Sequence, residues 1–169
     1  MDSTKNQRAQ SNTKTQKGKT LGFSITEVLT ATAITGVLSA VALPNYMEHM
    51  HGSRTKDAIT TIGSLQATLG AFMDATGERP TTWDDLTSIA AIMTDDGQAT
   101  GDLNQEIILP GSIYKLKVET INENTYTFNA TRVDNVPNHD VRACFNISNG
   151  ASDINSGNGE VNAMNPNCS

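Results

Sequence analysis

The dominant feature of the hydrophobic pattern is an apolar run of about 21 residues from Phe23 to Leu43. A polar segment precedes this run, and Pro44 follows it directly. As an α-helix the run would be roughly 31 Å long, which matches the hydrocarbon core of a bilayer. The pattern therefore predicts a helix that lies in a membrane or among other helices.

A second helical pattern follows Pro44, with apolar residues at spacings of three and four. Its members are Ile59, Ile62, Leu65, Leu69, Phe72 and Met73. Gly77 is a typical helix stop, so the helix should end between Asp74 and Gly77. We expect one helical spine over residues 24–75, roughly 78 Å long if it is continuous.

The segment after the spine begins with a capping-box pattern, because Thr82 precedes Asp85 by three residues. This pattern predicts a short helix from Trp83 to Met93. We expect the following loop, residues 97–112, to contain a short extended piece at 107–109. The side chains of the short helix that should face inward are Trp83, Leu86, Ile89 and Ile92.

Three later segments alternate apolar and polar residues with the period of a β-strand. They are Ile113–Thr120, Thr125–Arg132 and Val141–Ile147. Residues 148–169 are rich in Asn, Gly and Ser, a composition that by itself predicts disorder. The predicted fold class is therefore α+β, with a long N-terminal helical spine packed on a small antiparallel sheet.

Charge is distributed unevenly along the 169 residues. Residues 1–22 carry five Lys or Arg and one Asp, a net charge of +4, which leaves −10 for the rest of a chain whose total is −6. Basic residues next to a membrane helix favour the cytoplasmic side. We therefore expect a basic leader that stays inside, and an exported acidic head.

The start of the apolar run resembles the start of a type IV prepilin or pseudopilin. The matching residues are Gly22, Phe23, Glu27 and Pro44, with Ile25, Thr26, Val28 and Leu29 around the glutamate. The resemblance covers residues 19–50. It implies that a membrane peptidase cuts between Gly22 and Phe23 and methylates Phe23, and that Glu27 supports docking into a helical filament. The 22-residue leader is longer than the short leaders common among type IVa pilins.

Glu27 is the one carboxylate inside the apolar run. A charge there costs a few kcal/mol in lipid unless it is paired, so an acid at this position indicates a functional role. After cleavage, Phe23 would carry a free amine on the same helix face, four residues away. We predict that Glu27 pairs with this amine, or with that of a neighbouring subunit, which would fix the axial stagger of the subunits. The alternative is a membrane helix with one tolerated acid.

The predicted membrane helix is rich in small residues, which allow close approach of helices in lipid. Gly36 and Pro44 lower helical stability within it. The family resemblance implies that the segment between them can lose helicity on assembly. A secretory signal cleaved near Ser39–Ala42 is a rival interpretation, but its apolar core would be shorter.

Two cysteines, Cys144 and Cys168, lie in the part of the chain that we expect to be exported. An even number of cysteines in that setting predicts a disulfide bond. The strand pattern places Cys144 on the outer face of the sheet. The bond would therefore tie the polar tail across the sheet.

We predict neither an enzyme nor a cofactor, because no positioned acid–base pair or nucleophile motif is visible. His49 and His51 should face apart on the helix. The tail offers three oxygen ligands as calcium candidates, Asp153, Asn155 and Glu160, but its spacing does not fit an EF-hand and a solvated tail is the favoured interpretation. The strand cations suggest nucleic-acid binding only faintly, because phosphate binding needs a denser basic patch. They are Lys115, Lys117, Arg132 and Arg142.

The sequence thus predicts three parts: a cleaved leader (1–22), an assembly helix (23–52) and a head (53–169). The predicted function is a structural subunit of a type IV pilus, a homopolymer whose partners are the prepilin peptidase and the pilus assembly machinery. The subunit would reside in the inner membrane before assembly and in a cell-surface filament afterwards. The alternatives are a pseudopilin of type II secretion and a membrane-anchored binding domain that does not polymerise.

Overall fold

The computed structural model describes residues 22–122 and 124–169. The predicted leader, apart from Gly22, lies outside the described residues. The chain divides into two compact units after Ala42.

One helix, α1 (Ile25–Thr76), contributes to both units. Its bounds confirm the predicted spine to within one residue. The helix ends where Gly77 adopts a φ of 70° and donates its amide to the Met73 carbonyl at 2.8 Å. A side chain at Gly77 would be strained in this left-handed conformation, which explains the glycine at the stop.

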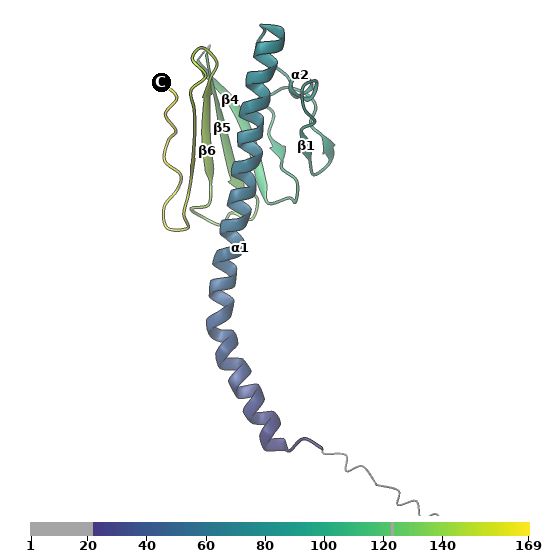
Figure 1. The fold of residues 1–169 in the computed structure, drawn as a ribbon, viewed down its shortest axis with the longest axis vertical. Helices are drawn as coiled ribbons and strands as arrows, with labels where there is room; N and C mark the ends of the chain where they lie inside the picture. Colours follow the sequence, from purple (N-terminus) through teal and green to yellow (C-terminus); the bar gives the residue numbers. More distant parts are fainter. Residues whose placement is uncertain (1–21, 123) are drawn as a thin grey trace, which may run out of the picture. The chain divides into compact units, whose positions relative to one another are not determined.

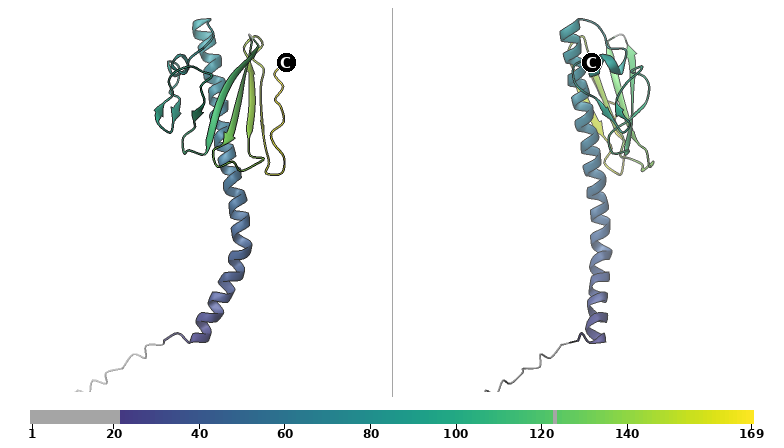
Figure 2. Two further views of the ribbon diagram at one scale, coloured as in Figure 1. Left: turned by 180° about the vertical axis from the view of Figure 1, so that it is seen from behind. Right: turned by 90° about the vertical axis from the view of Figure 1, so that its right-hand side faces the viewer.

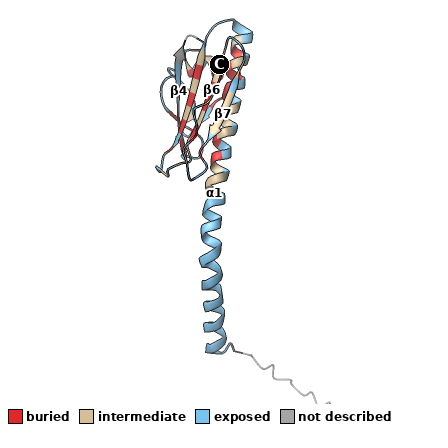
Figure 3. Cartoon of the chain, turned by 90° about the vertical axis from the view of Figure 1, so that its left-hand side faces the viewer, coloured by how far each residue is buried: buried red, intermediate tan, exposed pale blue. Residues whose placement is uncertain are grey.

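In the second unit, one face of α1 is buried against the sheet (Figures 1 and 3). Ile62, Leu65 and Leu69 are almost completely buried, as the spacing predicts. Gln66 is also buried, and its side-chain amide donates to the Cys144 carbonyl at 2.8 Å. The helix is therefore held to the sheet by apolar packing and by a hydrogen bond that gives the buried Gln66 amide an acceptor.

The larger sheet has the strand order β3-β4-β5-β6-β7, and every neighbouring pair is antiparallel. Phe128, at its centre, pairs with Val118 on one side and Ala143 on the other. Figure 2 shows the sheet from behind and from the side. The strands are β3 (Ile107–Ile108), β4 (Tyr114–Asn122), β5 (Thr125–Arg132), β6 (Val141–Asn146) and β7 (Ser152–Ser156).

The three predicted strands and the short extended piece are confirmed as β3 to β6. On β4 and β5 the predicted inward residues are buried, because alternation places every second side chain on one face. The fold class is α+β, as predicted. The buried residues contributed by β4 to β6 are Tyr114, Leu116, Val118, Tyr126, Phe128, Ala130, Val141 and Ala143.

The sequence predicts a tail that is ordered by the disulfide alone, but the structure also shows a strand in it, β7. Gly150 takes a φ of 72° in the turn before β7 and donates its amide to Asn146 at 2.9 Å. The strand then pairs with β6, with Ile154 opposite Ala143. Its other residues are polar, and polar composition of this kind disfavours strands. Pairing with β6 and packing of Ile154 against the core override that preference.

The predicted helix after Thr82 is real but short: α2 spans Trp83–Thr87. Its capping box is present, with the Asp85 amide donating to Thr82 Oγ1 at 3.1 Å. The predicted extension to Met93 is wrong, and Ile89 is 41% exposed instead of inward-facing. The chain beyond α2 forms a two-stranded hairpin. Its strands are β1 (Met93–Thr94) and β2 (Gly97–Gln98).

Candidate functional site: the exposed N-terminal helix and its anchors in the head

The first unit, over its described residues 22–42, exposes all of its side chains. α1 is long and apolar enough at this end to cross a membrane, judged by length and composition. Water is a poor solvent for such a surface, since each exposed apolar side chain costs about 1.5–3 kcal/mol relative to burial. The exposed large apolar residues are Phe23, Ile25, Val28, Leu29, Ile34, Val37, Leu38 and Val41.

Threonine hydroxyls on this helix are satisfied within the helix itself. Thr30, Thr32 and Thr35 each donate to the carbonyl four residues earlier, at 2.7–2.8 Å. Hydroxyls bonded in this way do not need water, so their cost of entering an apolar environment is reduced. The helix can therefore enter lipid or a helix bundle despite its threonine content.

Glu27 lies in the first turn of α1, and its carboxylate Oε2 accepts the Ser24 amide at 2.8 Å. The Ser24 carbonyl accepts the Val28 amide at 3.1 Å. The carboxylate thus satisfies a free amide at the positive end of the helix dipole. The predicted pairing of Glu27 with the Phe23 amine stays a prediction, because Phe23 is still joined to Gly22 in this chain.

Glu27 shares one face of the helix with mostly small residues. The side chains at 27, 31, 35 and 39 are one helical turn apart, and those at 28, 32 and 36 lie beside them. A face of this kind allows another helix to approach closely. The hollow along this face is lined by Phe23, Glu27, Val28, Ala31, Thr32, Thr35, Gly36 and Ser39.

The predicted weak points, Gly36 and Pro44, lie inside a continuous α1. Pro44 has no amide hydrogen and leaves the carbonyl four residues before it without its helical donor. Gly36 has open space around the position of an added Cβ. The helix is intact here, and its loss of helicity on assembly remains a prediction.

The Gly22–Phe23 bond, the predicted cleavage site, precedes α1. Phe23 is 88% exposed and Gly22 is also exposed. Both residues are therefore accessible while α1 stays folded.

The second unit contains the predicted disulfide between Cys144 and Cys168, with a Cα–Cα distance of 6.0 Å. The tail lies on the outer side of β6 and is held there by further side-chain bonds. Arg142 donates to Asn165 Oδ1 at 2.8 Å, and Asn146 donates to the Cys168 carbonyl at 2.9 Å. The tail is therefore tied across the sheet, as the sequence predicts.

Of the three calcium candidates, Asp153 and Asn155 contact one another. Asp153 Oδ2 accepts bonds from the Asn155 side chain at 3.2 Å and from the Asn167 amide at 2.9 Å. Glu160 lies in the later loop, where its carbonyl accepts from Asn138 at 2.8 Å. Within residues 22–122 and 124–169, no group of three or more His, Cys, Asp or Glu side chains is arranged to hold a metal ion.

The cations on the strands each have an acidic neighbour. Lys117 lies 2.7 Å from Glu119, and Lys115 lies 3.7 Å from Glu106. Arg142 pairs with Asp140 at 3.1 Å. These pairs reduce the positive field that a phosphate backbone would meet.

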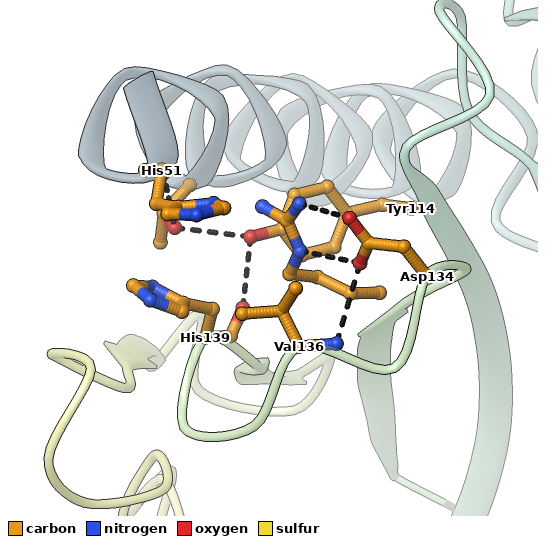
Figure 4. Close-up of polar contacts among 7 residues, drawn as sticks. His51, Tyr114, Asp134, Val136 and His139 are labelled. Carbon is orange, nitrogen blue, oxygen red and sulfur yellow. Dashed lines mark hydrogen bonds and ion pairs between the residues drawn. The ribbon is translucent and has the colours of Figure 1, made fainter. Parts of the chain in front are cut away.

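A polar cluster that the sequence interpretation missed lies between α1 and the loop after β5 (Figure 4). Arg132 is 1% exposed at its side chain, and its Nε donates to Asp134 at 2.8 Å. Hydrogen bonding from Arg132 holds the pKa of Asp134 well below its usual range. The members of this polar cluster are His51, Thr55, Tyr114, Arg132, Asp134 and His139.

The chain has no match among known protein-family models, curated proteins or solved structures. The architecture is compatible with a pilin-like subunit: a long N-terminal apolar helix on an antiparallel sheet with a disulfide.

Proposed function

We propose that this chain is a structural subunit of a type IV pilus. In this proposal the chain is cleaved between Gly22 and Phe23, methylated at Phe23 and polymerised through the N-terminal part of α1. The single observation that carries it is the complete exposure of an apolar helix that carries one acid, Glu27, in its first turn.

Such a helix needs an apolar environment at every stage. Burial in lipid provides it before assembly, and burial among the helices of other subunits would provide it afterwards. Transfer from one to the other exposes little apolar surface to water, so polymerisation meets no large hydrophobic cost. The small-residue face beside Glu27 supports close packing in the second environment.

In this proposal Glu27 distinguishes the cleaved chain from the uncleaved chain. In the uncleaved chain its carboxylate accepts the Ser24 amide. Cleavage would create a cationic amine one residue before Ser24, within reach of the same carboxylate. A charge pair is favoured over an amide contact in an apolar environment, so the new amine, from the same or a neighbouring subunit, would compete for Glu27.

We expect Glu27→Ala to abolish filaments while it leaves membrane insertion intact. Breaking a buried ion pair costs about 3–5 kcal/mol, which corresponds to a loss of at least roughly a hundredfold in the equilibrium constant for subunit addition. The measurement compares the amount of filament in sheared surface material with the amount of subunit in the membrane.

Glu48→Ala is the matched control, because Glu48 is an exposed acid on the same helix outside the apolar run. It should leave filament yield unchanged. Unchanged yield in Glu27→Ala would contradict the proposal and favour a membrane-anchored domain that does not polymerise. Loss of yield in both variants would also count against a specific role for Glu27.

A further inference from the structure

The polar cluster joins α1 to the loop between β5 and β6 through one tyrosine. The Tyr114 hydroxyl donates to the His139 carbonyl at 2.8 Å and lies 3.0 Å from Thr55 Oγ1 on α1. Thr55 Oγ1 also lies 3.0 Å from the His51 carbonyl, so its single proton can go to that carbonyl or to the Tyr114 oxygen. When Thr55 donates to Tyr114, two hydrogen bonds in series connect the helix to the loop.

The two imidazole rings of the cluster face one another across the same junction (Figure 4). The ring centroids of His51 and His139 are 5.1 Å apart, with an interplanar angle of 31°. Two neutral rings pack favourably at this distance, whereas two imidazolium ions would repel each other.

Charged groups of both signs surround the two rings. The Arg132 guanidinium is already buried beside Tyr114, 5.8 Å from its ring centroid, and its partner Asp134 is engaged with it. Glu48 from α1 and Glu160 from the tail loop line the hollow that both histidines share. Within the described chain neither glutamate forms an ion pair with a histidine.

Two nitrogen atoms of the cluster are buried and have no hydrogen-bond partner among the described residues: His51 Nδ1 and Arg132 Nη1. A buried polar atom without a partner is costly, so both of these atoms weaken the junction between the helix and the loop.

We propose that the contact between His51 and His139 is a pH-sensitive latch, which holds the β5–β6 loop on α1 while the His139 ring is neutral and releases it when acid protonates that ring. This inference does not depend on the filament proposal.

The direction of the effect follows from His139. Burial lowers the pKa of His139. The neighbouring His51 and Arg132 lower this pKa further, and Asp134 raises it. A histidine whose pKa is lower when folded binds more protons when unfolded, so stability rises with pH. An unfolded histidine has a pKa of about 6.5. The latch is therefore fully stable above this pH and loses stability as the pH falls below it. Asp134 affects stability in a separate pH range. Its folded pKa is lowered, so its contribution to stability is lost only when the pH falls below about 4.

The test is the pH dependence of unfolding for the full-length chain in detergent micelles. The single tryptophan, Trp83, is fully buried in the head and reports unfolding by its fluorescence in urea. Between pH 7.5 and 5.5 we expect the unfolding equilibrium constant to rise, by up to about tenfold for each pH unit below 6.5. His139→Gln should remove this rise. His49, an exposed residue of α1, lines a hollow with His139 and Lys56, but the ring packed on His139 is that of His51, so His49→Gln should retain the rise.

A wild-type slope in His139→Gln would overturn the latch. A second measurement covers the case in which that variant does not fold: an NMR titration of the imidazole signals of the wild-type chain. We expect the His139 ring to titrate below the ordinary value of about 6.5, and the amides of the β5–β6 loop to exchange faster as it does so. Titration of His139 at or above that value would equally overturn the proposal.

Discussion

Replacement of Leu69 by alanine is expected to lower the free energy of unfolding of the head by about 2–5 kcal/mol. Leu69 is completely buried on the face of α1 that packs on the sheet. Its truncation removes apolar contacts and leaves a cavity that a helix and a sheet cannot easily close. Small domains have a total stability of about 5–15 kcal/mol, so this one change removes a large share.

The measurement is urea denaturation of the full-length chain in micelles, followed by Trp83 fluorescence. Ile89→Ala is the matched control, because this side chain is 41% exposed and was wrongly predicted to be buried. It should cost less than about 1 kcal/mol. Equal effects of the two variants would mean that the face of α1 around Leu69 is not the centre of the core.

Removal of the disulfide is the second change with a large expected effect. We expect the double variant Cys144→Ser, Cys168→Ser to lose about 3 kcal/mol, the entropy of closing a loop of this length in the unfolded chain. The two cysteines are 24 residues apart in sequence. The loop between them contains β7 and the polar tail, which has few apolar anchors of its own.

The loss should be visible as faster proteolysis of the tail and as a lower urea midpoint. Reduction of the wild-type chain is the control, because it breaks the same bond without a change of sequence, and it should reproduce the midpoint of the variant. A tail that stays protected in both samples would show that β7 pairing and the bonds of Arg142 and Asn146 are sufficient by themselves.

Much of the fold could be predicted because its periodicities are long and regular. The spacing of Ile62, Leu65 and Leu69 defines one helix face, and the alternation in β4 and β5 defines one sheet face. β7 could not be predicted in this way, because it has one apolar anchor, Ile154, and its pairing depends on β6. The helix after Thr82 was overextended because Ile89 fits a helical spacing that the tertiary structure does not use.

The candidate site was predictable only where the signal is local. Ser24 and Glu27 have capping-box spacing, so their contact could have been found from the sequence. Gln66 has no such signal, since its partner is the backbone of Cys144 in a distant strand. The pairing of His51 with His139 also depends on tertiary structure, which brings the β5–β6 loop to α1.

The intact mass of the protein from native membranes and from sheared surface material tests the central proposal most directly. The account predicts a chain that begins at Phe23, carries one added methyl group and is present in the sheared fraction. The same processed chain confined to membranes would favour the pseudopilin alternative. An uncut chain, or one that begins near Val41, would contradict the account.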